Sequence, residues 1–168
     1  MAVEVKSGAN LLFLREEELR QAIELLFFAY RDFSAAPDAL LAEQDLGRAH
    51  HRVIYFIGRH PNITVSDLLA ILGITKQSLA RVLNQLIADG FVVQTPGLRD
   101  RRQRLLELTP KGVALERALT EKQRSRIAEA YRNAGPAAVE GFRKVMVELI
   151  DENDRKRFPR QPERVVRR

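Results

Sequence analysis

Residues 75–90 combine an apolar stripe with a polar face at the spacing of a helix. Apolar residues recur at steps of three and four, which places them on one side: Leu79, Val82, Leu83 and Leu86. The opposite side carries Gln77, Arg81 and Asn84, with Lys76 and Ser78 at the first turn. Thr75 can cap the free amides of that turn, and Gly90 can end the helix in a left-handed conformation. The pattern therefore predicts one amphipathic helix.

A second helical pattern lies directly before this one. Thr64, followed three residues later by Asp67, is a capping-box-like start, and apolar residues continue to Leu72. Gly73 and Ile74 then separate the two helices. Two helices joined by a short turn with glycine are typical of a helix-turn-helix.

The segment after the amphipathic helix has the pattern of a β-hairpin. Residues 91–94 form an apolar run suited to a strand, and residues 104–108 can return as the paired strand. The loop between them opens with Pro-Gly and carries three arginines: Arg99, Arg101 and Arg102. Residues 63–64 can add a third, very short strand. A helix-turn-helix followed by a basic hairpin predicts a winged helix-turn-helix, so the expected fold is mainly α with a small β wing.

A long helix is predicted over residues 10–33, and it is apolar on almost every face. Pro37 and its neighbours should end it, and Leu40 and Leu41 can form a short turn. So apolar a helix in a small chain indicates burial between two subunits, although packing within one subunit is the alternative. The next helix is expected over residues 45–58, with Asp45 as its cap.

Two further helices are predicted after the hairpin. Thr109 is placed as a cap with Pro110 at the first helical position, so this helix should run to about Asn133. Its middle is polar on every face, as in a helix that links two parts of a larger assembly. A last helix should follow from Pro136 to about Asn153. Terminal helices that pack across a two-fold axis would hold two reading helices at a fixed spacing, which suits a homodimer on an inverted repeat.

The composition bounds the possible classes of protein. The 168 residues fit one domain, or one domain with dimerisation arms, and the absence of Cys excludes disulfides and thiol redox sensing. No apolar run reaches transmembrane length and no secretory signal is visible, so a cytoplasmic protein without membrane association is expected.

The net charge of +6 is concentrated at the C-terminus, because residues 154–168 contribute five of these charges. That segment is expected to be a disordered tail, either contacting phosphates or simply solvated. The clustered cations of the hairpin therefore argue for DNA better than the net charge does. The expected organisation is an N-terminal dimerisation helix, a DNA-binding region, C-terminal dimerisation helices and the tail: residues 1–36, 37–108, 109–153 and 154–168.

The polar face of the amphipathic helix suits a DNA major groove. Gln can bond adenine in two places, Arg can do the same to guanine, and the arginines of the wing can reach phosphates or the minor groove. The alternative for the helix alone is an ordinary solvated surface. The residues assigned to double-stranded DNA are Thr75, Lys76, Gln77, Ser78, Arg81, Asn84, Arg99, Asp100, Arg101 and Arg102.

The wing carries a motif that resembles one family. Asp100-x-Arg102, followed by Leu108-Thr109 and Gly112, resembles the wing signature of the MarR family of transcriptional regulators. The resemblance covers roughly residues 11–153. It implies that Gln77, Ser78 and Arg81 lie in the major groove. It also implies that Arg102 enters the minor groove, with Asp100 bracing the wing and Arg101 as a second cation.

The resemblance further implies an effector cleft where the dimerisation helices meet the winged domain. Here that cleft would involve Tyr30, Phe33, His50 and Ile54. An aromatic wall with one titratable group suits an aromatic or phenolic carboxylate. Plain core packing is the alternative for each of these residues.

Other chemistry has little support in the sequence. His50 and His51 are adjacent, and neighbouring helical residues point about 100° apart, so they are poor co-ligands and no metal or other cofactor is expected. No phosphate loop or catalytic triad is visible, so no enzymatic function is expected. The sequence favours a homodimeric repressor that binds a palindromic DNA site and responds to a small molecule. The alternative is an architectural or protein-interaction winged helix without strong sequence specificity.

Overall fold

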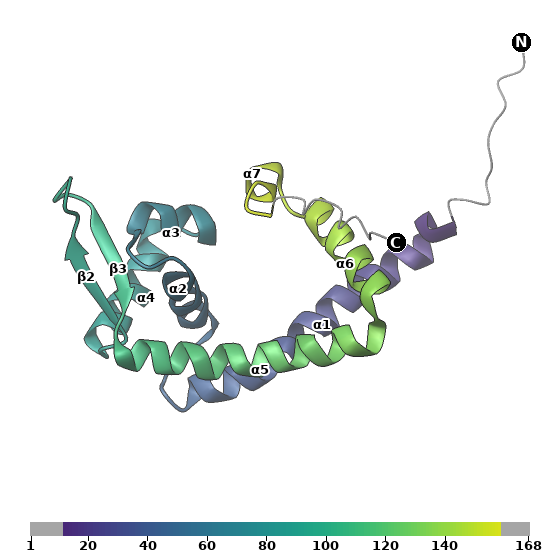
Figure 1. Cartoon of the computed structure of the whole chain (residues 1–168), viewed down its shortest axis with the longest axis horizontal. Coiled ribbons are helices and arrows are strands. Elements are labelled where there is room, and N and C mark those ends of the chain that lie inside the picture. Colours follow the sequence, from purple (N-terminus) through teal and green to yellow (C-terminus); the bar gives the residue numbers. More distant parts are fainter. Residues whose placement is uncertain (1–11, 159–168) are drawn as a thin grey trace, which may run out of the picture. The chain divides into compact units, whose positions relative to one another are not determined.

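The computed structural model describes residues 12–158, and the chain there is mainly helical with one small sheet (Figure 1). The elements in order are α1 (Glu16–Ala42), α2 (Arg48–Arg59), β1 (Ile63–Thr64), α3 (Val65–Leu72), α4 (Lys76–Ala88), β2 (Val92–Pro96), β3 (Arg104–Leu108), α5 (Pro110–Ala134), α6 (Pro136–Leu149) and α7 (Glu152–Arg155). The chain divides into two compact units, and the boundary falls inside α5 after Arg124. The predicted fold class is confirmed, because a helix-turn-helix and a β wing lie in the first unit.

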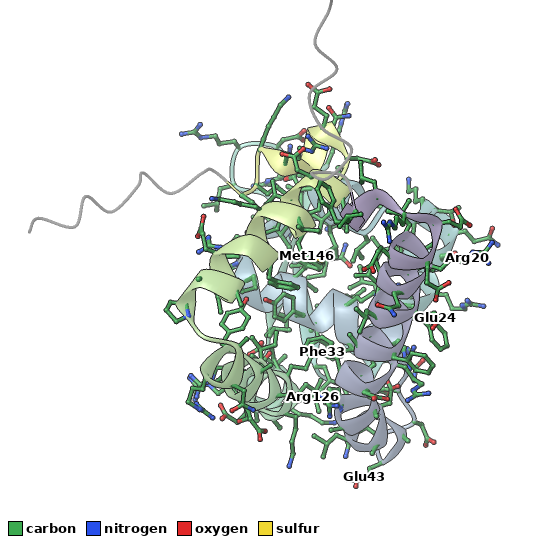
Figure 2. The ribbon with its side chains drawn as sticks, turned by 90° about the vertical axis from the view of Figure 1, so that its right-hand side faces the viewer. Arg20, Glu24, Phe33, Glu43, Arg126 and Met146 are labelled. Carbon is green, nitrogen blue, oxygen red and sulfur yellow. The ribbon has the colours of Figure 1, made fainter. Side chains whose placement is uncertain are left out.

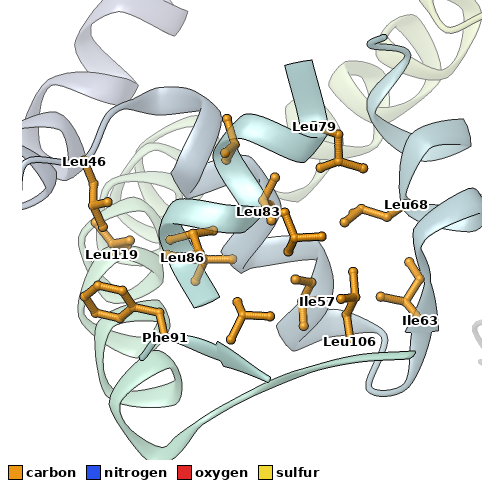
Figure 3. Packing of buried hydrophobic residues seen from close by; sticks show 14 of the residues in the cluster. Leu46, Ile57, Ile63, Leu68, Leu79, Leu83, Leu86, Phe91, Leu106 and Leu119 are labelled. Carbon is orange, nitrogen blue, oxygen red and sulfur yellow. The ribbon is translucent and has the colours of Figure 1, made fainter. Parts of the chain in front are cut away.

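The first unit is built on one hydrophobic core (Figure 3). Its members come from α1, α2, α3, α4, the strands, the first half of α5 and two connecting segments. They include Leu41, Leu46, Ile54, Ile57, Leu68, Leu79, Leu83, Leu86, Phe91, Leu106 and Leu119. The apolar stripe predicted for α4 is thus the face that holds this helix to the rest of the unit. Burying a side chain of this size stabilises the fold by roughly 1.5–3 kcal/mol, so the placement of α4 is strongly determined.

The sheet has three antiparallel strands in the order β1-β3-β2. Val92 pairs with Leu108 and Pro96 with Arg104, so β2 and β3 form the hairpin of the wing. Ile63 pairs with Leu106, which confirms the short third strand expected beside the wing. Because β3 lies in the middle, its Leu106 is fully buried and attaches the wing to the core.

The first helix does not end where the sequence predicted. α1 runs without a break through Pro37 to Ala42, so the expected turn at Leu40 and Leu41 and the segment boundary after residue 36 both fall inside a helix. A proline inside a helix removes one hydrogen bond and costs about 3 kcal/mol. The burial of Ser34, Pro37 and Leu41, spaced by three and four residues on one face, outweighs that cost. The expected start at Asn10 lies outside the described residues.

The start of the second helix was also predicted wrongly. α2 begins at Arg48 with Gly47 as its N-cap, whereas Asp45 has a positive φ of 54° and lies in the connecting turn. An aspartate tolerates this left-handed conformation better than most residues. The backbone N–H of Gly47 donates to Nδ1 of His50 at 3.1 Å, so a histidine supplies the hydrogen bond that closes the helix start.

The second unit contains the end of α5, then α6 and α7. α6 ends at Leu149, not near Asn153, because Ile150 is extended and a separate turn of helix follows. The guanidinium of Arg155 stabilises this corner by donating to the carbonyl oxygens of Glu148 and Ile150 and to the Glu148 carboxylate. The first residues of the predicted disordered tail are therefore helical, while residues 159–168 lie outside the described part of the chain.

Between residues 12 and 158 there is no helix with the length and apolar character needed to cross a membrane.

The end of α4, the wing and the start of α5 are joined around Thr109. Its backbone N–H donates to the carbonyl oxygen of Phe91 at 3.0 Å, and its hydroxyl donates to that of Gly90 at 2.6 Å. The same hydroxyl accepts the N–H of Gly112 at 3.0 Å, which caps α5 as predicted. Gly112 lies so close to Phe91 that a Cβ at this position would collide with the Phe91 carbonyl oxygen. This contact explains why a threonine and a glycine occur three residues apart after the wing.

We expect Gly112→Ala to destabilise the protein by about 3 kcal/mol, because the added methyl group must displace backbone that lies at the base of the wing. Urea unfolding followed by circular dichroism measures the change. Gly141→Ala in α6 is the matched control, since an added Cβ there meets no atom within 4 Å. The control should be neutral or stabilising by up to about 1 kcal/mol. Equal stability of Gly112→Ala and the unchanged protein would contradict the role assigned to this contact.

Candidate nucleic-acid interface

The two helices of the helix-turn-helix begin and end as their sequence predicted. Thr64 caps α3, since its hydroxyl oxygen accepts the Asp67 N–H at 3.0 Å while its hydroxyl hydrogen points to the Asp67 carboxylate. Gly73 then turns the chain in a left-handed conformation with φ of 61°. Thr75 caps α4 by accepting the N–H of Ser78 at 3.2 Å. Local hydrogen bonds thus set the turn between the helices.

The outer face of α4 is open to solvent. Leu79, Val82, Leu83 and Leu86 are buried, whereas four of the residues of α4 assigned to DNA are exposed: Lys76, Gln77, Arg81 and Asn84. Ser78 is half-buried, and its Oγ accepts the hydroxyl of Thr75 at 2.9 Å. The hydrogen of the Ser78 hydroxyl can still donate to a ligand. The structure therefore presents donors and acceptors of the predicted set on one accessible helix face.

A residue that the sequence reading did not select holds α4 in place. The side-chain oxygen of Gln85 lies 2.8 Å from Nε2 of His50, and its amide nitrogen donates to the Asp45 carbonyl oxygen at 3.3 Å. Since Nδ1 of His50 accepts the Gly47 N–H, Nε2 carries the proton and donates to Gln85. Gln85 follows Arg81 by four residues, and only the fold shows that it meets α2 and not solvent.

The loop at the tip of the wing is ordered by its own hydrogen bonds. The N–H of Gly97 donates to the Gln103 carbonyl oxygen at 3.0 Å, and the Gln103 N–H donates to that of Asp100 at 3.1 Å. A Cβ on Gly97 would lie 2.6 Å from the Asp100 carbonyl oxygen, so the tight turn requires glycine. The Asp100 carboxylate accepts the backbone N–H of Arg102 at 2.9 Å.

Asp100 therefore braces the wing through the backbone. Arg99, Arg101 and Arg102 are all exposed at this tip. Leu98 is also completely exposed, which the sequence reading overlooked because it considered only the charged residues of the loop. The tip of the wing thus combines a hydrogen-bonded turn with three cations and one exposed apolar side chain.

Two of the four residues predicted for an effector cleft have roles in the fold. Ile54 is fully buried in the core, and both ring nitrogens of His50 are used in the bonds to Gly47 and Gln85. These contacts match the alternative of plain packing for His50 and Ile54. Phe33 is half-buried on α1, and Figure 2 labels it among the side chains of that helix.

Tyr30 is the exposed member of the predicted cleft and lies beside two arginines of α2. Arg52 donates to its phenolic oxygen at 2.9 Å, and this hydrogen bond lowers the pKa of Tyr30. The guanidinium of Arg48 lies 5.4 Å from the centre of the Tyr30 ring and pairs with Asp38 at 2.7 Å, which raises the pKa of Arg48. The tyrosine therefore forms part of a cationic surface where α1 meets α2.

His51 differs from its neighbour, because burial lowers the pKa of its imidazole. Its side chain is half-buried. Within residues 12–158 no three His, Asp or Glu side chains gather in a way that could hold a metal ion.

Comparison with known proteins supports the interpretation of this geometry. The family model described as MarR family matches residues 44–103, which contain α2, the helix-turn-helix and most of the wing. The HTH-type transcriptional regulator PetP of Rhodobacter capsulatus is 54% identical over 151 residues, covering 90% of this chain and 91% of PetP. The chain belongs to the MarR family.

Solved structures of MarR-family proteins share the fold of this chain. The crystal structure of Streptococcus pneumoniae FabT in complex with DNA is similar over 78% of this chain and 94% of FabT, with a TM-score of 0.70 and 20% identity. A mutant MarR from E. coli complexed with operator DNA covers 83% of this chain and 99% of its own, with a TM-score of 0.63 and 21% identity. MarR-family regulators are non-enzymatic DNA-binding proteins, so the expectation that this chain is not an enzyme is confirmed by its family.

Proposed function

We propose that this MarR-family regulator is a homodimer that reads a palindromic promoter site and represses transcription. The observation that carries the proposal is the exposed polar face of α4, which is held by a buried apolar face and capped on Thr75. An α-helix fits the B-DNA major groove, and its exposed side chains can then bond base edges. Support comes also from the relatives FabT and MarR, which have been solved with DNA.

Within this proposal Gln77, Ser78 and Arg81 face base edges, while Thr75, Lys76 and Asn84 lie at the border of the contact. An arginine can donate two parallel hydrogen bonds to guanine, which makes Arg81 the residue with most discriminating power. Arg99, Arg101 and Arg102 would approach phosphates and the minor groove, where a narrow groove concentrates negative potential. Asp100 would hold the tip in shape for that approach through its bond to the Arg102 backbone.

Arg81→Ala should weaken binding to the best site by ~1–3 kcal/mol and relax the preference at one base pair of each half-site. The best site is first recovered by selection from random DNA. The affinity of the protein for this duplex and for variants with single base changes is then measured by titration at two salt concentrations. Arg117→Ala is the control, because Arg117 is exposed on α5 and belongs to no proposed contact. An equal loss on all duplexes would assign Arg81 to phosphate. Equal affinity of the unchanged protein for every duplex would favour an architectural role.

The proposed homodimer is supported by apolar side chains that lie exposed on both units. On α1 they include Leu19, Ile23, Leu25, Leu26, Phe27 and Phe28, with exposed fractions from 44% to 68%. The second unit exposes Phe142, Val145 and Leu149 along α6. Figure 2 shows the side chains of both helices, with Arg20 and Glu24 labelled on α1 and Met146 on α6. So many exposed large apolar side chains are unusual on a monomer, and a second copy of the chain would cover them.

The unchanged protein should sediment as a dimer of about twice 19.2 kDa at micromolar concentration. Ile23→Asp and Leu149→Asp place a carboxylate in the proposed interface, where it would be desolvated, so each should shift the protein toward monomer. Gln21→Asp is the control, since it adds the same charge at an exposed polar position of α1. A well-folded monomer of the unchanged chain would contradict the proposed dimer.

We further propose that a small aromatic or phenolic carboxylate binds beside Tyr30 and Phe33 and weakens DNA binding. The support is Arg52, whose guanidinium donates a hydrogen bond to the phenolic oxygen of Tyr30 and could pair with a carboxylate. His50 and Ile54 would support this surface from within the fold, because the side chain of His50 is hydrogen-bonded and that of Ile54 is buried.

Benzoate is the probe for the effector site, and transcription in vitro from a bound promoter is the readout. The protein should lower transcription, and millimolar benzoate should restore it. Arg52→Gln should repress as well as the unchanged protein but respond at least several-fold less to benzoate, because it lacks the cation. Cyclohexanecarboxylate tests the need for an aromatic ring. A full response of Arg52→Gln would move the site elsewhere, and activation of the promoter by the protein would contradict repression.

A further inference from the structure

Leu98 is a large apolar residue that the fold does not bury. Its side chain is 100% exposed, more than that of any other large apolar residue among those described, and it lies between Gly97 and Arg99 at the tip of the wing. A single exposed leucine is common on protein surfaces and needs no explanation by itself. Here, however, the turn that carries it is ordered on both sides.

The order of this turn comes from the backbone. The Gly97 N–H donates to Gln103, and the Asp100 carboxylate accepts the Arg102 N–H. Gly97 itself is buried, so the turn is packed immediately before Leu98. A side chain on such a turn loses little further freedom on binding, because its backbone is already arranged. Leu98 is thus presented to a partner on a preformed support.

The neighbours of Leu98 indicate which partner it meets. Arg99, Arg101 and Arg102 follow it on the same loop, and all three are exposed. Cations of this density are attracted to phosphates and to the negative potential of a narrow minor groove. An exposed leucine among them would be carried to the floor and walls of that groove. An apolar protein surface would match the leucine but not the three cations, and the family to which this chain belongs binds DNA.

We propose that Leu98 is a specificity-determining residue that inserts its side chain into the minor groove at a TpA step in the flank of the site. The proposal rests on the proposed DNA binding by the wing. Leucine is one of the apolar residues that proteins insert at base steps of the minor groove, and pyrimidine–purine steps such as TpA open most easily. The minor groove of A/T pairs also lacks the amino group of guanine, which would obstruct a hydrocarbon side chain.

This role differs physically from that of the neighbouring arginines. An arginine prefers a stiff, narrow A-tract, whereas an inserted leucine prefers a step that deforms, even when both flanks are composed only of A and T. The free energy that an arginine contributes by binding a phosphate weakens with salt, because the contact releases counterions. The contribution of an inserted leucine does not depend on salt in this way, because the leucine releases no counterions. Flank preference and salt dependence therefore separate the two contributions.

The test compares duplexes with the same selected half-sites and three flanks: one with a TpA step, one with an A-tract and one with G/C pairs. The unchanged protein should bind the TpA flank about 10-fold tighter than the A-tract, which corresponds to ~1.4 kcal/mol. Leu98→Ala should reduce this ratio to about 2-fold or less, with an unchanged salt slope. Leu98→Met should retain most of the preference, because methionine is also apolar and of similar volume. Fluorescence of 2-aminopurine placed at the TpA step should rise with the unchanged protein and not with Leu98→Ala.

Val93→Ala is the matched control, since Val93 is an apolar residue of the wing that is 42% exposed but lies on β2 away from the tip. It should leave the flank preference unchanged. An unchanged ratio in Leu98→Ala, or an equal loss in Val93→Ala, would overturn the role of Leu98. If the unchanged protein reads the half-sites but ignores the flank, only this inference fails. If it binds all duplexes alike, the proposed sequence reading fails as well.

Discussion

Thr109 lies where three parts of the first unit meet: the end of α4, the base of the wing and the start of α5. Its hydroxyl and amide donate hydrogen bonds to the carbonyl oxygens of Gly90 and Phe91, which directly follow the end of α4. Gly112 permits the backbone of α5 to approach Phe91 closely enough for these bonds to form. This one contact therefore joins the end of α4, the hairpin and the start of α5.

α4 is held on its inner side by buried apolar side chains and at one point by a hydrogen-bond network. The leucines of α4 set its depth in the core, while the bonds from Gln85 to His50 and Asp45 resist rotation about the helix axis. Hydrophobic burial is not directional, whereas hydrogen bonds are, so the two kinds of contact act on different motions. Together they present Gln77 and Arg81 on a face whose direction is already determined before a ligand binds.

The wing obtains its order by different means. Val92 of β2 and Leu106 of β3 anchor the hairpin in the core, and the tip depends on its own turn around Gly97 and Asp100. Such a tip can carry arginines and an exposed leucine without harm to the fold, because neither has to pack. The fold therefore separates the firmly packed α4 from a wing tip whose side chains do not have to pack, and in this chain the tip carries both cations and an apolar side chain.

Local signals in the sequence were sufficient for much of this protein. Four residues at helix ends have roles that are local in the sequence: Thr64, Gly73, Thr75 and Gly90. A cap or a left-handed residue satisfies backbone groups only a few residues away, so its role can be predicted from the sequence. The strands of the wing and the caps at Thr109 were predictable for the same reason. Contacts between distant residues were decided by the tertiary structure alone. The burial of Ser34 and Leu41 carries α1 through Pro37, and the approach of α2 to α4 gives His50 and Gln85 their roles. A local sequence pattern cannot show the free energy of such contacts, because the partners are far apart in the sequence and meet only when the core has formed.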